Sequence, residues 1–130
     1  MTTDAIAVRE STDEALALVC NLPADSQAAR RVDVFEVLAS AMSAKSLADG
    51  VELSFPNTDD TASSIFGLVL AERNCCPQFH YEIVFEPNHG PLQLRVRACG
   101  EFVQQLQNLY LGLAAEAGVM IIDTPAHARS

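Results

Sequence analysis

The residues of this chain that are best suited to chemistry lie in one short segment, Ala71-Glu-Arg-Asn-Cys-Cys-Pro-Gln-Phe-His80. It contains two adjacent thiols, Cys75 and Cys76, together with the carboxylate of Glu72 and the imidazole of His80. Soft ions such as Hg(II), Cd(II), Cu(I) and Zn(II) prefer thiolate ligands, and imidazole or carboxylate can complete such a site. Adjacent cysteines rarely bond to each other, because the resulting ring is strained. The segment therefore favours metal ligation, and the alternative is a pair of reduced cysteines that only fill the core.

The two remaining cysteines also lie at the ends of predicted elements. Cys20 is near the end of an apolar run at 15–22, and Cys99 follows a predicted strand and precedes Gly100. A sheet with both at its rim would bring them near the adjacent pair. Three thiolates would then suit a trigonal ion, and four would suit tetrahedral zinc or an iron–sulfur cluster. The predicted metal ligands are Cys20, Cys75, Cys76, Cys99, Glu72 and His80.

Thiol catalysis is a further interpretation of the same segment. Cys75 or Cys76 would be the nucleophile, and His80 or Glu72 would be the acid–base group. However, the pair is predicted at the C-terminus of a helix, where partial negative charge disfavours a thiolate. These observations disfavour an enzyme, and no catalytic or cofactor-binding residue is assigned.

The composition is that of a globular domain with an acidic surface. Of the 130 residues, 49% are hydrophobic and 19% are charged, and the formal net charge is −9. An acidic surface repels phosphate backbones, so nucleic-acid binding by this chain alone is not expected. The apolar runs are shorter than the roughly 18 residues of a membrane span, and residues 1–11 lack the features of a secretory signal. These features predict a cytoplasmic protein without a membrane partner, in which four cysteines form no disulfide framework.

Hydrophobic periodicity predicts the elements that would position these residues. Strands are expected where apolar residues alternate, and helices where they recur every three or four positions. In chain order the expected elements are a strand at 15–22, a helix at 26–44, a strand at 51–55, a helix at 59–73, strands at 80–86 and 92–98, a helix at 102–118, and an apolar run at 119–122 that is either a last strand or a docking segment.

The first two helices are each expected to bury one apolar stripe. The stripe of the helix at 26–44 includes Val32 and Met42, which leaves Arg30 on the outer face. The stripe of the helix at 59–73 includes Phe66 and Leu70, and helical spacing would continue it to the thiols.

This order of elements predicts a single α+β domain at 14–123, with a flexible arm at 1–13 and a flexible tail at 124–130. An antiparallel sheet of four to five strands would carry three helices packed on one face. From residue 50 onward the order of strands and helices is that of a ferredoxin-like fold. The apolar run at 119–122 would also provide a contact surface for a homodimer.

Three motifs together resemble a known group of proteins. They are Glu-x-x-Cys-Cys-Pro with the following aromatic Phe79, the preceding Gly50-Val-Glu-Leu-Ser-Phe55, and Cys20 ahead of Leu22-Pro23. The pattern, over about residues 15–115, resembles small uncharacterised bacterial Cys-Cys-Pro proteins and the C-terminal module of some heavy-metal-type MerR regulators. The resemblance implies a module in which Cys20, Cys75 and Cys76 bind a metal ion or a thiol-reactive ligand. This chain departs from the pattern in Cys99, and it lacks the helix-turn-helix half, so a regulatory role would need a partner.

The sequence therefore predicts a cytoplasmic protein that senses, buffers or transfers a soft metal ion, with Zn, Hg, Cd and Cu as the candidates. Another small thiol-reactive ligand would fit the same residues. The alternatives are a Cys-ligated iron–sulfur protein, a thiol-redox enzyme, and a structural interaction domain with reduced core cysteines.

Overall fold

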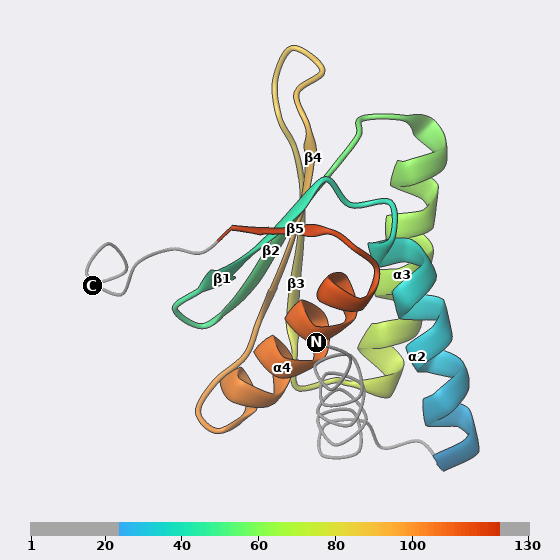
Figure 1. Ribbon diagram of the computed structural model, residues 1–130, viewed down its shortest axis with the longest axis vertical. Helices are drawn as coiled ribbons and strands as arrows, with labels where there is room; N and C mark the ends of the chain where they lie inside the picture. The colour runs from blue at the N-terminus through green and yellow to red at the C-terminus, as the bar shows by residue number, and fades with distance from the viewer. Residues whose placement is uncertain (1–23, 123–130) are drawn as a thin grey trace.

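The computed structural model describes residues 24–122, which form an α+β fold of three helices and five strands (Figure 1). The strand expected at 15–22 and the predicted arm and tail lie outside the described residues. The elements are α2 (Ala24–Leu38), β1 (Ser43–Leu47), β2 (Gly50–Phe55), α3 (Asp59–Cys75), β3 (His80–Phe85), β4 (Leu92–Arg97), α4 (Phe102–Glu116) and β5 (Met120–Ile122).

The sheet is mixed, so the prediction of an antiparallel sheet is wrong at one ladder. The strand order is β3-β4-β2-β1-β5, and every neighbouring pair is antiparallel except β1 with β5. Strand β1 occupies the edge of β2 that β5 would otherwise pair with. Because β1 runs opposite to β2, β5 meets β1 in parallel. The ferredoxin-like arrangement is not confirmed, since the additional strand separates β2 from β5.

The helix expected at 26–44 is shorter in the structure, because a turn at 39–42 follows α2 and β1 begins at Ser43. Helix α2 ends at Leu38, and the Ser40 hydroxyl donates to the Val37 carbonyl at 2.8 Å. Such side-chain bonds compete with continued helix formation. Ser43–Leu47 then pairs residue by residue with β2, with the buried Ala44 opposite the buried Leu53. The strongly alternating β2 therefore imposes a strand on a segment whose own pattern is weak.

The buried stripes of α2 and α3 agree with the predicted ones at Leu38 and Ile65 and differ from them elsewhere. Val32, Phe66 and Leu70 are 51%, 48% and 53% exposed, whereas Val34 and Leu68 are buried. Both helices also turn a charged residue inward, and these two residues form an ion pair, described below. Helix α3 itself begins as expected, since the Thr58 hydroxyl accepts a bond from the Thr61 amide at 3.1 Å.

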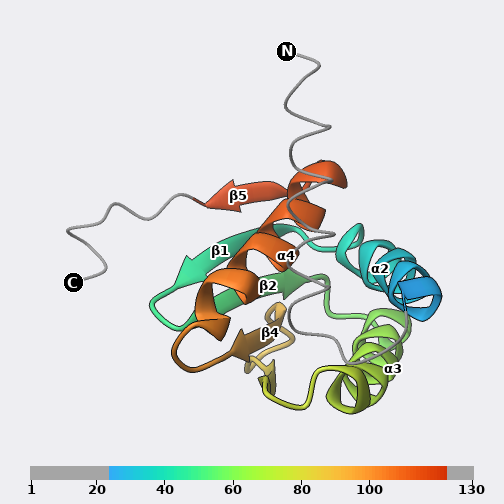
Figure 2. The same cartoon turned by 90° about the horizontal axis from the view of Figure 1, so that it is seen from below.

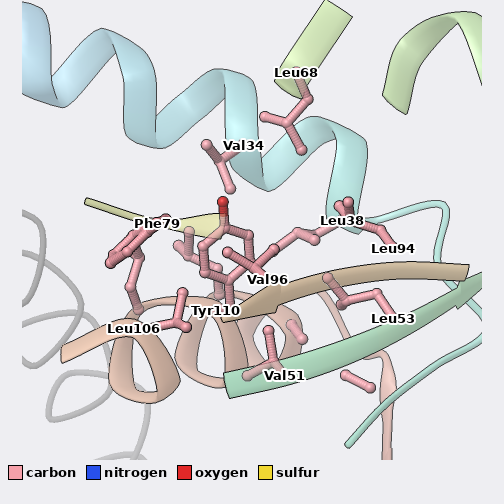
Figure 3. Close-up of a cluster of buried hydrophobic side chains, with 14 of the residues drawn as sticks. Val34, Leu38, Val51, Leu53, Leu68, Phe79, Leu94, Val96, Leu106 and Tyr110 are labelled. Atoms are coloured by element: carbon pink, nitrogen blue, oxygen red, sulfur yellow. The ribbon is translucent and has the colours of Figure 1, made fainter. Parts of the chain in front are cut away.

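The core lies between the sheet and the helices (Figures 2 and 3). Helix α4 packs on the sheet and α2 packs on both α3 and α4. Tyr110 stands at the centre of this core and is fully buried. The other sheet face carries cross-strand ion pairs such as Arg97 with Glu82 at 2.8 Å. Among the described residues, no helix is both long and apolar enough to cross a membrane.

Candidate metal centre

The end of α3 gathers three potential ligands inside the protein. Glu72 and Cys75 lie on its buried face, and Cys76 is the residue that ends the helix. All three are at most 2% exposed. One carboxylate oxygen and the two sulfurs lie within 4.8 Å of one another. The Cys76 thiol donates to the Cys75 sulfur, with 3.6 Å between the two Sγ atoms.

Local backbone geometry explains why both sulfurs can turn inward. Cys76 leaves the helix with φ −127° and ψ 71°, because the proline that follows it disfavours helical backbone at the preceding residue. Its amide still donates to the Glu72 carbonyl at 2.6 Å, and its own carbonyl accepts from the Phe79 amide at 3.2 Å. This turn returns the chain to β3 and keeps the Cys76 side chain on the inner side.

The carboxylate of Glu72 is held by two residues from other helices. Arg30 of α2 donates from Nε and Nη2 to Oε2 at 3.2 and 2.9 Å, and the Tyr110 hydroxyl of α4 donates to Oε1 at 3.2 Å. In Figure 3 the Tyr110 hydroxyl points away from α4 toward α2. Burial raises the pKa of the Glu72 carboxyl, and the bonds from Arg30 and Tyr110 oppose part of that rise. The carboxylate is therefore fixed in place and has a buried counter-charge.

The three cysteines that the structure describes differ in chemical state. Cys75 is disulfide-bonded, whereas Cys76 and Cys99 carry free thiols. Burial, together with the negative charge of Glu72, raises the pKa of the Cys76 thiol to about 12. Cys76 is therefore a neutral thiol at neutral pH and a poor nucleophile. A bound cation would reverse this preference by displacing the proton.

The remaining predicted ligands do not join this group. His80 is exposed at the first position of β3, and Cys99 is exposed beyond the end of β4. Cys20 lies outside the described residues. Within residues 24–122, only Glu72, Cys75 and Cys76 form a cluster that could hold a metal ion.

Three residues that the sequence analysis did not assign belong to the surroundings of this cluster. Arg30 and Tyr110 hold Glu72, and Tyr81 of β3 couples electrostatically to Glu72 and Cys76. Arg30 precedes the buried Val34 and Leu38 at helical spacing. That spacing was the available signal that this arginine faces inward.

A groove of about 500 Å³ lies between α2 and α3. Its lining includes the carboxylates of Asp33, Glu36 and Asp60. Arg30 lines the same groove, donates to Asp33 from Nη1 at 2.9 Å, and contacts Glu72. Arg30 therefore contacts both the acidic groove and the buried carboxylate.

No protein-family model, no curated protein and no solved structure matches this chain. The chemistry of the cluster is therefore argued from its own geometry.

Proposed function

We propose that the chain binds a soft metal ion through the thiolates of Cys75 and Cys76, and that it senses, buffers or transfers this ion in the cytoplasm. The observation that carries the proposal is the buried pair of sulfurs 3.6 Å apart beside a buried carboxylate. Core cysteines that act only as small hydrophobes do not need a buried charge next to them. The ion would act as the cation that stabilises both thiolates.

The spacing of the sulfurs favours one class of ion. Two thiolates on a tetrahedral ion at a metal–sulfur distance of about 2.3 Å lie ~3.8 Å apart. This value is close to the observed 3.6 Å. A linear two-coordinate ion with similar bonds would hold the sulfurs ~4.6 Å apart. The pair therefore fits Zn(II) or Cd(II) with less movement than it fits linear Hg(II) or Cu(I).

The charge balance of the cluster supports a divalent ion. Arg30 and Glu72 neutralise each other at 2.9 Å. Two thiolates and one divalent ion add no net charge, and a neutral assembly is the least costly one to bury. A third thiolate from Cys20, which the resemblance to the metal-responsive regulators implies, would add one negative charge with a divalent ion. With a trivalent ion such as As(III), three thiolates would be neutral.

The disulfide at Cys75 makes binding depend on reduction. A disulfide sulfur is no thiolate, so the site needs a thiol reductant before it can load. Disulfides are rare in the reducing cytosol, so the proposed location requires Cys75 to be reduced there.

The same disulfide favours thiol–disulfide exchange as a second candidate function. The Cys76 sulfur lies 3.6 Å from the oxidised Cys75 sulfur. Attack there would break the disulfide of Cys75, release the thiolate of its partner and form a Cys75–Cys76 disulfide, which closes a strained ring. However, a thiol with a pKa of about 12 supplies very little thiolate at neutral pH. Metal binding therefore stands first. An iron–sulfur cluster draws no support from Cys99, which is exposed and outside the group.

Native mass spectrometry and metal analysis on anaerobically reduced protein test the proposal. We expect uptake of one zinc or cadmium ion by the wild type, and its loss in Cys75→Ser and Cys76→Ser. Cys99→Ser is the matched control and should bind like the wild type. If the reduced wild type takes up neither zinc, cadmium nor mercury, the metal-binding proposal is wrong.

A further inference from the structure

Strand β3 (His80–Phe85) forms one edge of the sheet, and among residues 24–122 it pairs on one side only, with β4. The outer side of an edge strand presents amide and carbonyl groups that can hydrogen-bond to a strand of another chain. Proteins usually protect such an edge with a lysine, a proline or a very short strand. Strand β3 has six residues and contains neither lysine nor proline. It is therefore suited to pair with a further strand.

Exposed apolar side chains lie beside this edge. Phe85, the last residue of β3, is exposed, and its ring stacks on that of Phe66 with 6.4 Å between the ring centroids. Phe66 and Leu70 are both exposed and lie one turn apart on the same side of α3. A chain that pairs with β3 would also cover these three side chains, and the burial of their apolar surface would favour association.

The opposite edge of the sheet offers less to a partner. Strand β5 (Met120–Ile122) is also exposed, but it has three residues where β3 has six. A shorter strand forms fewer hydrogen bonds with a neighbour. The apolar run at 119–122 is therefore the weaker candidate for a dimer contact.

Symmetry and charge limit how a second copy of the chain can pair with β3. A twofold axis makes the two β3 strands antiparallel and keeps the same face of each sheet on the same side, so odd-numbered residues oppose odd-numbered ones. Two registers of this kind keep most of each strand paired. One places Glu82 opposite its own copy, and like charges directly opposite each other destabilise paired strands. The other places Ile83 opposite its own copy.

The register centred on Ile83 is self-complementary. It places Tyr81 opposite Phe85 of the second copy, and aromatic cross-strand pairs stabilise a sheet. It also places His80 opposite Glu86 of the second copy, so that an imidazole can donate to a carboxylate. The twofold axis repeats each of these contacts. Charge and side-chain type therefore favour this register over the one centred on Glu82.

We infer that the protein forms a homodimer in which the β3 strands of two copies pair in the register centred on Ile83 and join the two sheets. The same axis brings the two α3 helices toward each other, so that Phe66 and Leu70 pack against their counterparts. This interface covers the strand edge and the exposed apolar side chains together. The inference goes beyond the proposed metal binding and does not depend on it.

Sedimentation equilibrium of the reduced full chain measures dimerisation, and two variants of Val84 test the register. Val84 lies opposite Glu82 of the second copy in this dimer, so Val84→Glu places two carboxylates directly opposite each other. We expect its dimer dissociation constant to rise about tenfold, because the axis repeats the repulsion. Val84→Lys is the matched control. It faces the same carboxylate with the opposite charge and should dimerise at least as tightly as the wild type.

Met120→Glu is the control for the other edge of the sheet. It changes the net charge by the same amount on the exposed strand β5 and should leave the dissociation constant unchanged. If Met120→Glu weakens the dimer and Val84→Glu does not, β5 forms the interface and the inference is wrong. Equal dissociation constants for Val84→Glu and Val84→Lys would contradict the register. A wild type that stays monomeric at its highest soluble concentration would overturn the dimer itself.

Disulfide cross-linking determines the register independently of these charges. Only the residue on the axis lies opposite its own copy, at a Cα–Cα distance of about 4.5–5.5 Å that a disulfide can bridge. The exposed Cys99 is first replaced, in Cys99→Ser, which serves alone as the control. In that background Ile83→Cys should form covalent dimers once the reductant is removed, and Glu82→Cys should form few. Covalent dimers of Glu82→Cys in preference to Ile83→Cys would overturn the inferred pairing.

Discussion

The guanidinium of Arg30 donates two hydrogen bonds to a single oxygen of Glu72, from Nε at 3.2 Å and from Nη2 at 2.9 Å. The carboxylate side chain is fully buried and that of the arginine is 15% exposed. This contact joins α2 to α3 at the turn where the thiols lie. It fixes the orientation of both helices and determines the charge that the cysteines experience.

Removing the arginine should therefore destabilise the protein strongly. In Arg30→Met a buried carboxylate loses its counter-charge, and we expect a loss of about 3–5 kcal/mol in the free energy of unfolding. Urea denaturation of the reduced protein measures it. The double variant Arg30→Met/Glu72→Gln should recover most of the loss, because no charge is then left unpaired.

Arg95→Met is the control for this experiment. Arg95 pairs with Glu52 at 2.7 Å on the sheet face that carries the ion pairs, with 30% of its side chain exposed. Surface pairs of this kind contribute up to about 1 kcal/mol. If Arg30→Met were no more harmful than Arg95→Met, the pairing with Glu72 would not hold the helices in place.

The two free thiols should differ sharply in reactivity. Cys99 is exposed, whereas Cys76 is buried and its pKa is raised to about 12. Alkylation near pH 8, followed by peptide mass spectrometry, should label Cys99 well before Cys76 in the folded protein. In denaturant the two rates should converge. A Cys76 that reacts first in the folded state would favour the thiol-redox enzyme over the metal-binding protein.

Part of this organisation follows from the sequence alone. The alternation in β2, β3 and β4 predicts those strands, and the structure confirms all three. Strands β2 and β4 bury alternate residues in the core, whereas β3 is only partly buried. The sequence names Glu72, Cys75 and Cys76 as candidate ligands at the end of one helix, and the structure places these three together. The local sequence pattern is enough to predict a feature when all of its residues belong to one helix or strand.

The features that the sequence did not predict depend on contacts between distant elements. Strand β1 owes its conformation to pairing with β2 and β5, since its own residues alternate weakly. A charged residue such as Arg30 is expected at the surface. It turns inward here because it pairs with Glu72, which is 42 residues away in the sequence. The Tyr81 hydroxyl is buried without a hydrogen-bond partner among the described residues, which is likewise a property of the packed structure. The predicted ligand Cys20 lies outside the described residues, and its role stays a prediction.

Alkaline pH should destabilise the metal-free protein through Cys76. Its pKa is raised in the folded state from 9.0 to about 12, so the folded protein holds this proton more tightly than the unfolded chain. The resulting stability is fully present below pH 9 and is lost as the pH rises toward 12. Urea midpoints of reduced wild type should therefore fall over this window. They should fall less in Cys76→Ala, and equal slopes in the two proteins would contradict a buried protonated thiol.

Metal affinity should rise with pH. The slope of the logarithm of the affinity against pH should equal the number of thiols that become thiolate ligands. Each thiol that becomes a ligand releases one proton, so two ligands give an increase of about a hundredfold per pH unit below the thiol pKa values. Three ligands would give about a thousandfold. Chelator competition between about pH 6 and 8, with correction for the chelator's own protonation, measures this slope.

The same slope decides the role of Cys20. If Cys20 is the third ligand, as the resemblance implies, Cys20→Ser should lower the slope from three protons to two, and Cys99→Ser should leave it unchanged. If Cys75 and Cys76 are the only thiolates, the wild type should already show two protons. A flat affinity over this range would exclude thiolate ligation, since no donor would then have exchanged a proton for the ion.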